Sequence, residues 1–239
     1  MYEISGRVGY SETDPGGVMT LKSVAERFQD VSYFELADRG FDRDYFAARN
    51  VGWFIFFWQI DVLAAPRINE RIAVGTFPYR TGGLSECRNY YVRDCDGNDL
   101  VLANSVWSLV DLGRMQIVKL PDEIKERDTV KGRLEMDYLG RRIVFPPDLS
   151  FEEIGRCAVA PWQLDSNRHL NNSRYIEMAL ANSDLNTERI RRICVEYQSQ
   201  APEGATLRFL SAREGENRYV VCASDSGKSF CRMKIETAE

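Results

Sequence analysis

The sequence is poor in the residues that build metal sites and disulfide frameworks. It has one histidine, His169, in 239 residues. Its six cysteines form no Cys-x-x-Cys pair; they are Cys87, Cys95, Cys157, Cys194, Cys222 and Cys231. Zinc sites usually need several Cys and His ligands at short spacings, so we expect no metal and no other cofactor. The cysteines are expected to be reduced and mostly buried.

Long apolar runs are also absent. The longest aromatic and apolar run, Trp53–Trp58, is far shorter than the roughly 18 residues that a membrane helix needs. The first residues lead directly into a strand-like stretch, 4–10, without a charged and then apolar leader. We therefore expect a cytoplasmic protein with no transit peptide and no membrane association.

An excess of basic residues is missing too. The chain has 31 Lys and Arg against 36 Asp and Glu, for a net charge of −5. Such a chain has no overall attraction for nucleic acid or for an anionic membrane surface. Its hydrophobic fraction of 44% and charged fraction of 28% are typical of a globular protein. The length suits one large domain or two small ones.

The first half of the chain has the pattern of one helix followed by strands. Apolar residues recur at helical spacing from Leu21 to Phe34, with Thr20 as N-cap and Gly40 beyond the end. Strands are predicted from β-branched, aromatic or alternating residues over 52–63, 71–79, 85–93 and 100–110. The stretch Asp94–Asn98 predicts a hairpin turn between the last two strands.

The second half repeats this order in a shorter form. A strand over about 155–160 leads into a polar loop, 162–171, and then into a helix with Tyr175 and Ile176 on its apolar face. Further strands are predicted over 193–199, 206–213, 218–223 and 229–235. The repeated order of elements indicates an internal duplication.

Two offsets relate the halves. An offset of 151 residues aligns Asp14 with Asp165, each just before its helix. The same offset aligns two further pairs, Gly16 with Asn167 and Val18 with His169. The strand residues 59–62 match 194–197 at an offset of 135. The first half therefore carries about 16 extra residues between its helix and this strand.

One helix and several antiparallel strands, twice over, predict an α+β fold of two tandem hotdog domains, each an antiparallel sheet wrapped around a central helix. Charge clusters, Pro121 and the pair Pro146-Pro147 indicate a connection between the halves. We expect an N-terminal hotdog domain over 1–130, a linker over 131–150 and a C-terminal hotdog domain over 151–239.

The stretch from Trp162 to Tyr175 is the most informative for chemistry. It contains the single histidine, the only side chain whose unperturbed pKa lies near neutrality. Amide groups at a helix N-terminus can bind a developing oxyanion, and a hydrolytic reaction also needs a group that positions or deprotonates water. Asp and Asn before a helix are, however, common caps and turn formers, so these residues alone leave a structural role open.

The pattern Asp165-x-Asn167-x-His169-x-Asn171-Asn172, with Trp162 before it and Tyr175-Ile176 after it, resembles the signature of plant and bacterial acyl-acyl-carrier-protein thioesterases. The likeness extends to residues 53–66 and 92–111 and covers about residues 3–236. It implies that Asp165, Asn167 and His169 are catalytic. Asn167 and His169 would contact the thioester or the attacking water, and Asp165 would orient them. Asn171 and Tyr175 are expected to contact substrate.

The sequence departs from the plant pattern Leu-Glu-Tyr-Arg-Arg-Glu-Cys, in which the last Glu and Cys have each been assigned a catalytic role. Gln200 and Ala201 stand at these places, which excludes a cysteine nucleophile there. An amide accepts no proton usefully near pH 7. We therefore predict direct hydrolysis in which His169 or Asp165 takes the proton and Gln200 orients water. Glu196, on the same predicted strand face as Gln200, is either a reserve base or a structural ion-pair partner.

The resemblance also implies that the first half provides much of an acyl pocket. On the predicted strand Trp53, Ile55 and Phe57 face one way and are expected to line this pocket. The expected partners are a fatty acyl substrate and the acyl carrier protein that holds it through phosphopantetheine. Neither nucleic acid nor membrane is expected as a partner, and a homodimer is among the expected assemblies.

The predicted function is hydrolysis of fatty acyl-acyl carrier protein, which releases free fatty acid and ends chain elongation in a bacterial cytoplasm. Two other functions stay open. One is a different hotdog enzyme, such as an acyl-CoA thioesterase or a dehydratase. The other is a non-catalytic acyl-carrier-binding module, because Gln200 stands where a base is expected.

Overall fold

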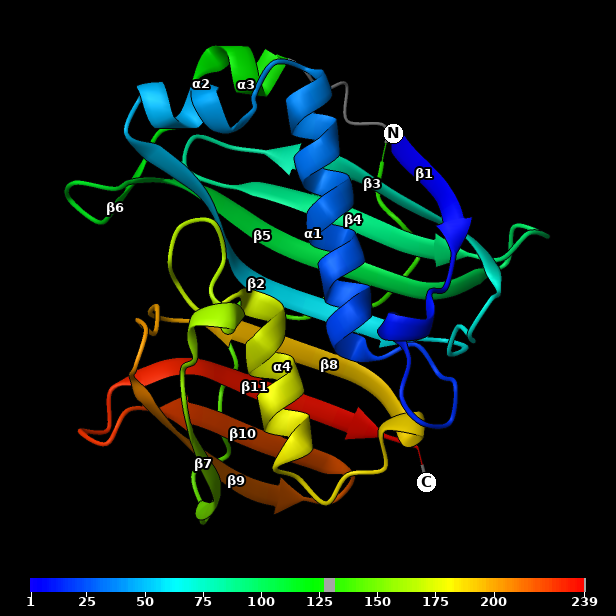
Figure 1. Cartoon of the computed structure of the whole chain (residues 1–239), viewed down its shortest axis with the longest axis vertical. Coiled ribbons are helices and arrows are strands. Elements are labelled where there is room, and N and C mark those ends of the chain that lie inside the picture. Colours follow the sequence, from blue (N-terminus) through cyan, green and yellow to red (C-terminus); the bar gives the residue numbers. More distant parts are fainter. Residues whose placement is uncertain (127–131, 239) are drawn as a thin grey trace. The chain divides into compact units, whose positions relative to one another are not determined.

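The structure, a computed structural model, describes residues 1–126 and 132–238 (Figure 1). The chain divides into two compact units. The first consists of Met1–Thr20 and Val24–Leu139, and the second of Leu21–Ser23 and Gly140–Glu239. The domain end predicted at residue 130 lies outside the described residues. The change from one unit to the other falls within the range 131–150 that was predicted as a linker.

The first unit is built on an antiparallel sheet with the strand order β1-β3-β4-β5-β2, to which β6 adds by pairing with β5. In chain order its elements are β1 (Tyr2–Arg7), η1 (Tyr10–Glu12), α1 (Leu21–Asp38), α2 (Arg43–Ala48), β2 (Val51–Val62), β3 (Arg71–Thr81), β4 (Glu86–Arg93), β5 (Asp99–Asp111), β6 (Gln116–Val118) and α3 (Asp122–Glu126). The long helix and the four strands from β2 to β5 are confirmed to within two residues at each end.

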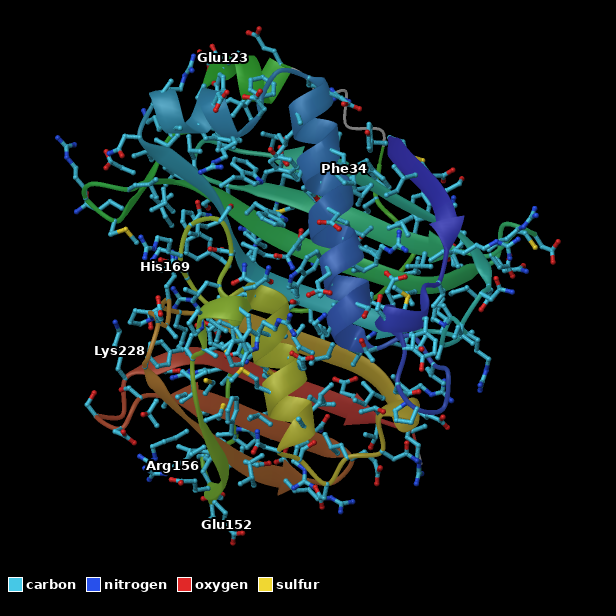
Figure 2. The ribbon with its side chains drawn as sticks, in the orientation of Figure 1. Phe34, Glu123, Glu152, Arg156, His169 and Lys228 are labelled. Atoms are coloured by element: carbon cyan, nitrogen blue, oxygen red, sulfur yellow. The ribbon has the colours of Figure 1, made fainter. Side chains whose placement is uncertain are left out.

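The helix α1 lies across one face of this sheet, which we call the inner face (Figure 1). The ring of Phe28 packs on Trp58 of β2 and on Tyr90 of β4, with ring centroids 5.8 and 5.0 Å apart. The expectation that Phe34 continues the apolar stripe is wrong. Phe34, which Figure 2 labels on α1, is 42% exposed, whereas Glu35 is 1% exposed. Seven residues after Phe28 a helix has made two turns, so residue 35 points inward.

A buried ion cluster explains why a charged residue occupies that inward position. Arg88 of β4 is fully buried, and its Nη2 lies 2.6 Å from Glu35 Oε2. Its Nη1 lies 2.7 Å from Glu86 Oε1, and Arg39 Nε lies 3.0 Å from Glu35 Oε1. Burial opposes a charge on Arg88, but Glu86 and Glu35 together hold the pKa of the guanidinium above its ordinary value. The cluster ties α1 to the sheet.

The opposite, outer face of the first sheet is covered by residues 132–139. Gln59 Oε1 accepts a hydrogen bond from Leu139 N at 3.0 Å, and Asn89 Oδ1 accepts one from Leu134 N at 3.1 Å. These buried amide side chains therefore bond to the backbone of the covering segment. This part of the predicted linker is packed on the first unit.

The second unit is built on antiparallel strands in the order β8-β11-β10-β9-β7. In chain order its elements are β7 (Glu152–Ala158), η2 (Pro161–Gln163), α4 (Asn172–Ala181), η3 (Thr187–Arg189), β8 (Ile190–Tyr197), β9 (Thr206–Glu214), β10 (Asn217–Ala223) and β11 (Ser229–Thr237). The helix α4 packs on the inner face of this sheet, where the rings of Tyr175 and Tyr197 have centroids 5.9 Å apart. Ile176 and Ala179 are fully buried beside them.

Residues 140–150 lie on the outer face of the second sheet. Ile143 N donates to Glu196 Oε2 at 2.9 Å, and the ring of Phe145 packs edge-on against Tyr219 with centroids 5.8 Å apart. The guanidinium of Arg232 stands 4.9 Å from the Phe145 ring centroid. This later part of the predicted linker is therefore packed on the second unit.

An antiparallel sheet crossed by one helix occurs in both units, which is the predicted hotdog arrangement. The helix α1 has 18 residues and α4 has 10. The longer helix, followed by the six-residue α2, accounts for most of the extra length predicted in the first half.

Neither a disulfide nor a membrane-spanning helix occurs in the described residues. All six cysteines belong to this part of the chain, none of them is in a disulfide, and four of them are buried. None of the helices there is both long enough and apolar enough to cross a bilayer.

Candidate functional site

The predicted catalytic motif forms a tight turn between η2 and α4. The Oδ1 atom of Asp165 accepts hydrogen bonds from the backbone N–H groups of Asn167, at 2.8 Å, and His169, at 3.1 Å. The backbone closes the turn, because Asp165 N donates to His169 O at 2.8 Å. The structure therefore brings these three residues together, with the Asp165 carboxylate as the group that orders the other two.

Arg168, inside this turn, has a left-handed backbone conformation with φ of 62°. For a residue with a side chain this conformation costs about 1–2 kcal/mol, and such strain tends to occur at functional sites. The Arg168 side chain is exposed. The turn thus holds a strained backbone immediately before His169.

His169 lies in the loop that precedes α4, and its side chain is partly exposed (Figure 2). Its Nδ1 atom is buried and has no hydrogen-bond partner among the described residues. A buried polar atom without a partner costs about 1–3 kcal/mol, and a bound water or ligand is a usual explanation. The imidazole is therefore open to a hydrogen bond from a water or a ligand.

The first unit contains the same turn without the polar side chains. Asp14 Oδ1 accepts hydrogen bonds from the N–H groups of Gly16, at 2.9 Å, and Val18, at 3.0 Å. Asp14 N donates to Val18 O at 2.9 Å, and Gly17, with φ of 74°, takes the left-handed position. Each of these hydrogen bonds has its counterpart 151 residues later, which confirms the duplication and its offset. The scaffold is present twice, but the amide and imidazole side chains are present once.

Asn171 is the N-cap of α4. Its Oδ1 accepts a hydrogen bond from Ser173 N at 3.0 Å, and its backbone oxygen accepts one from Arg174 N at 2.9 Å. The N–H groups of Ser173 and Arg174 at the start of α4, which could otherwise bind an oxyanion, are thus already hydrogen-bonded. The NH2 group of Asn171 remains as the part of its side chain that can reach a ligand.

Tyr175 is only 2% exposed, so the predicted substrate contact does not agree with its position. Its hydroxyl accepts a hydrogen bond from Ala201 N at 3.0 Å. Burial raises the pKa of Tyr175 well above its ordinary value, so the phenol stays neutral. The side chain therefore bonds to the protein backbone in the core under α4.

Gln200 lies in the loop after β8, and its side chain is partly buried. Leu170 N donates to Ala201 O at 3.2 Å, and His169 forms a bridge pair with Pro202. The segment that carries Gln200 therefore runs alongside the segment that carries His169. Backbone pairing places His169 opposite Pro202, and Gln200 lies two residues before Pro202 in the same segment.

The predicted relation between Glu196 and Gln200 is wrong. The strand β8 ends at Tyr197, two residues earlier than predicted, so alternation along a strand does not extend to Gln200. The Glu196 carboxylate accepts a hydrogen bond from Ile143 N at 2.9 Å on the outer face. Glu196 therefore holds the segment 140–150 instead of standing beside Gln200.

A β-bulge separates the three residues predicted to line the acyl pocket. Ile55 pairs with Trp107, whereas Phe57 pairs with Val106. Directly opposed residues share a face of the sheet and neighbours along a strand do not. The expectation of one shared face is therefore wrong. Trp53, stacked on Trp107 at 6.4 Å, and Ile55 lie on the inner face, and Phe57 lies on the outer face.

The second unit thus has the parts for activation of a water molecule. An imidazole nitrogen can take a proton from water, and the amide side chains of Asn167 and Gln200 can donate to an oxyanion or hold a water. Within the described residues no group of three or more His, Cys, Asp and Glu side chains is arranged to hold a metal ion.

The fold and the motif define the class, a double-hotdog protein with an Asp-Asn-His turn in its second unit. A family model for the acyl-ACP thioesterase N-terminal domain matches residues 1–127, and one for the acyl-ACP thioesterase C-terminal domain matches residues 152–237. The chain belongs to the acyl-ACP thioesterase family.

Individual relatives are distant. The chloroplastic acyl-[acyl-carrier-protein] hydrolase FATB2 of Cuphea viscosissima is 23% identical over 207 residues, which cover 81% of this chain and 50% of that protein. The chain thus spans about half the length of the curated relatives it matches.

Solved structures share the whole architecture. An acyl-ACP thioesterase from Bacteroides thetaiotaomicron superposes with a TM-score of 0.87 at 21% identity, covering 99% of this chain and 97% of that one. The 12:0-ACP thioesterase from Umbellularia californica gives a TM-score of 0.81 at 18% identity, covering 99% and 96%. These likenesses confirm the predicted α+β fold of two hotdog domains.

Proposed function

We propose that this chain hydrolyses the thioester of fatty acyl-acyl carrier protein and releases the free fatty acid, which ends chain elongation. One observation carries the proposal: the buried Nδ1 of His169 has no hydrogen-bond partner within the part of the chain that the structure describes, and His169 sits on a turn that Asp165 orders. Membership of the acyl-ACP thioesterase family supports the choice of a thioester as substrate.

In the proposed reaction His169 takes a proton from water as the water oxygen attacks the thioester carbonyl carbon. The carbon–sulfur bond then breaks, and the imidazolium returns the proton to the leaving thiolate. The side chain of Asn167 donates to the oxyanion. The Oδ1 of Asp165 already accepts two backbone hydrogen bonds, which supports a scaffolding role for Asp165 and leaves His169 as the base.

Gln200 orients the attacking water in this proposal. Support comes from the backbone pairing that runs its loop alongside His169 and Leu170. An amide can donate to and accept from one water at the same time, but it does not take up a proton near pH 7. Gln200 therefore sets the position of the water, and the proton goes to His169.

The two units divide the work in this proposal. The C-terminal hotdog domain, 151–239, carries the catalytic turn, and the N-terminal hotdog domain, 1–130, binds the acyl chain. The stacked Trp53 and Trp107 and the buried Ile55 on the inner face support an apolar binding surface. Trp53 and Ile55 stay in the proposed lining and Phe57 leaves it. Asn171 contacts substrate through its NH2 group.

The proposed partner is acyl carrier protein, with the acyl group held on its phosphopantetheine arm. We place the protein in a bacterial cytoplasm, a reducing compartment in which cysteines outside disulfides, as all six are here, are the rule. A homodimer would be detected by light scattering on the purified protein.

Release of free thiol from purified acyl-acyl carrier protein tests the proposed function, with the same acyl group on coenzyme A as the comparison. The proposal predicts turnover of both thioesters to free fatty acid and a higher kcat/KM for the carrier-protein form. A preference for the CoA form would assign an acyl-CoA thioesterase instead. Binding of acyl-carrier protein without thiol release would assign a binding module, and neither result is compatible with the proposal.

A further inference from the structure

The peptide that joins Gln200 to Ala201 is held from two sides. Its N–H group donates to the Tyr175 hydroxyl at 3.0 Å, and the next carbonyl, Ala201 O, accepts from Leu170 N at 3.2 Å. Ala201 and Tyr175 are 0% and 2% exposed. The first contact comes from the first turn of α4 and the second from the residue after His169. Together they fix the backbone on which Gln200 stands.

The first unit forms the same loop contact with different residues. Met19 N donates to Pro66 O at 2.8 Å, as Leu170 N does to Ala201 O. Pro66 stands at the place of Ala201 and Val24 at the place of Tyr175, by the offsets of 135 and 151. Proline has no N–H group and valine offers no acceptor. The first unit thus lacks both members of the phenol–amide pair.

The Tyr175–Ala201 pair and the polar side chains of the site occur in the same unit. The unit with the pair has Asn167, His169 and Gln200, and the other unit has glycine, valine and alanine at those places. A buried N–H without an acceptor costs about 1–3 kcal/mol, which a proline avoids. The fold of the loop alone therefore needs neither the phenol nor the N–H group.

We propose that Tyr175 is a positioning residue, which holds the Gln200–Ala201 peptide so that the Gln200 amide keeps a fixed place beside His169. This inference rests on the proposed function, because Tyr175 would act through the water that Gln200 orients. It replaces the substrate contact predicted for Tyr175. The neutral phenol accepts the amide hydrogen, and its own hydroxyl hydrogen takes no part in the reaction.

The test is a double-mutant cycle between Tyr175→Phe and Gln200→Ala, with kcat and KM measured on acyl-acyl carrier protein. Tyr175→Phe should lower kcat by about 10-fold to 100-fold, the range for a misplaced reacting group, with KM changed by less than about twofold. In the Gln200→Ala background the same substitution should change kcat by less than about twofold. The melting temperature should fall equally in both backgrounds.

Tyr197→Phe is the matched control, because it also removes a buried tyrosine hydroxyl, and that hydroxyl donates to Asn172 O at 2.8 Å instead of accepting from Ala201 N. It should lower the melting temperature but leave kcat within about twofold of the wild type. If Tyr175→Phe does not fold, Ala201→Pro offers a second cycle. With no N–H group to satisfy, the stability loss from Tyr175→Phe should largely disappear in that background.

Three results would overturn the inference while the wild type still releases thiol. The first is an unchanged kcat for Tyr175→Phe, and the second is an unchanged kcat for Gln200→Ala. The third is a double variant whose fold-loss in kcat equals the product of the two single losses. An inactive wild type would instead refute the proposed function itself, so the two failures are distinguishable.

Discussion

The two copies of the Asp turn permit a matched test of what Asp165 does. In Asp165→Ala the N–H groups of Asn167 and His169 lose their acceptor, and Asp14→Ala does the same to Gly16 and Val18. At about 1 kcal/mol for each hydrogen bond, each variant should lose about 2 kcal/mol of stability. For a chain of this size that corresponds to a melting temperature lower by about 4–8 °C.

The activities of the two variants should differ although their stabilities match. Asp165→Ala should reduce turnover of acyl-acyl carrier protein by about 100-fold, because it releases His169 from its position. Asp14→Ala should stay within about twofold of the wild type below its melting temperature. Calorimetry and thiol release on the same preparations provide both quantities.

Asp165→Asn separates scaffolding from proton transfer. An asparagine Oδ1 can accept the same two backbone hydrogen bonds, but it cannot take up a proton near pH 7. The scaffold role predicts that this variant keeps turnover within about 10-fold of the wild type. A variant that melts normally but is as inactive as Asp165→Ala would refute that role and make Asp165 itself the base.

Two predictions concern stability. Arg168→Gly should raise the melting temperature by about 2–4 °C, because glycine relieves about 1 kcal/mol of left-handed strain; an unchanged or lower value in calorimetry would contradict the strain at φ 62°. Arg88→Met should cost about 3–5 kcal/mol, because the buried carboxylates of Glu35 and Glu86 lose their shared cation. The triple variant with leucine at both glutamates should recover most of that loss in urea unfolding, and no recovery would argue against a charge effect.

Much of the fold was predictable because the patterns that encode it are local. The apolar period of α1, the alternation in β2 to β5 and the hairpin turn at Asp94–Asn98 lie within single segments. The duplication was visible for the same reason, since Asp14 and Asp165 each precede a helix. The place of His169 in a turn before α4 followed from this register.

The features that were missed depend on partners far away in the sequence. A glutamate can occupy the inward position 35 because Arg88, 53 residues later, neutralises it. The bulge before Phe57 exists only in relation to β5. The burial of the Tyr175 hydroxyl depends on the loop at Ala201. A comparison of the two halves could have exposed this last contact, because tyrosine and alanine in one half correspond to valine and proline in the other.

The central claim is that the imidazole of His169 activates water for hydrolysis of the thioester. Its most direct test is the turnover of acyl-acyl carrier protein by His169→Ala, with Val18→Ala at the corresponding place in the first unit as the control. The account predicts a loss of about 100-fold or more for His169→Ala and turnover within about twofold of the wild type for Val18→Ala. Near-normal turnover by a folded His169→Ala protein would contradict it.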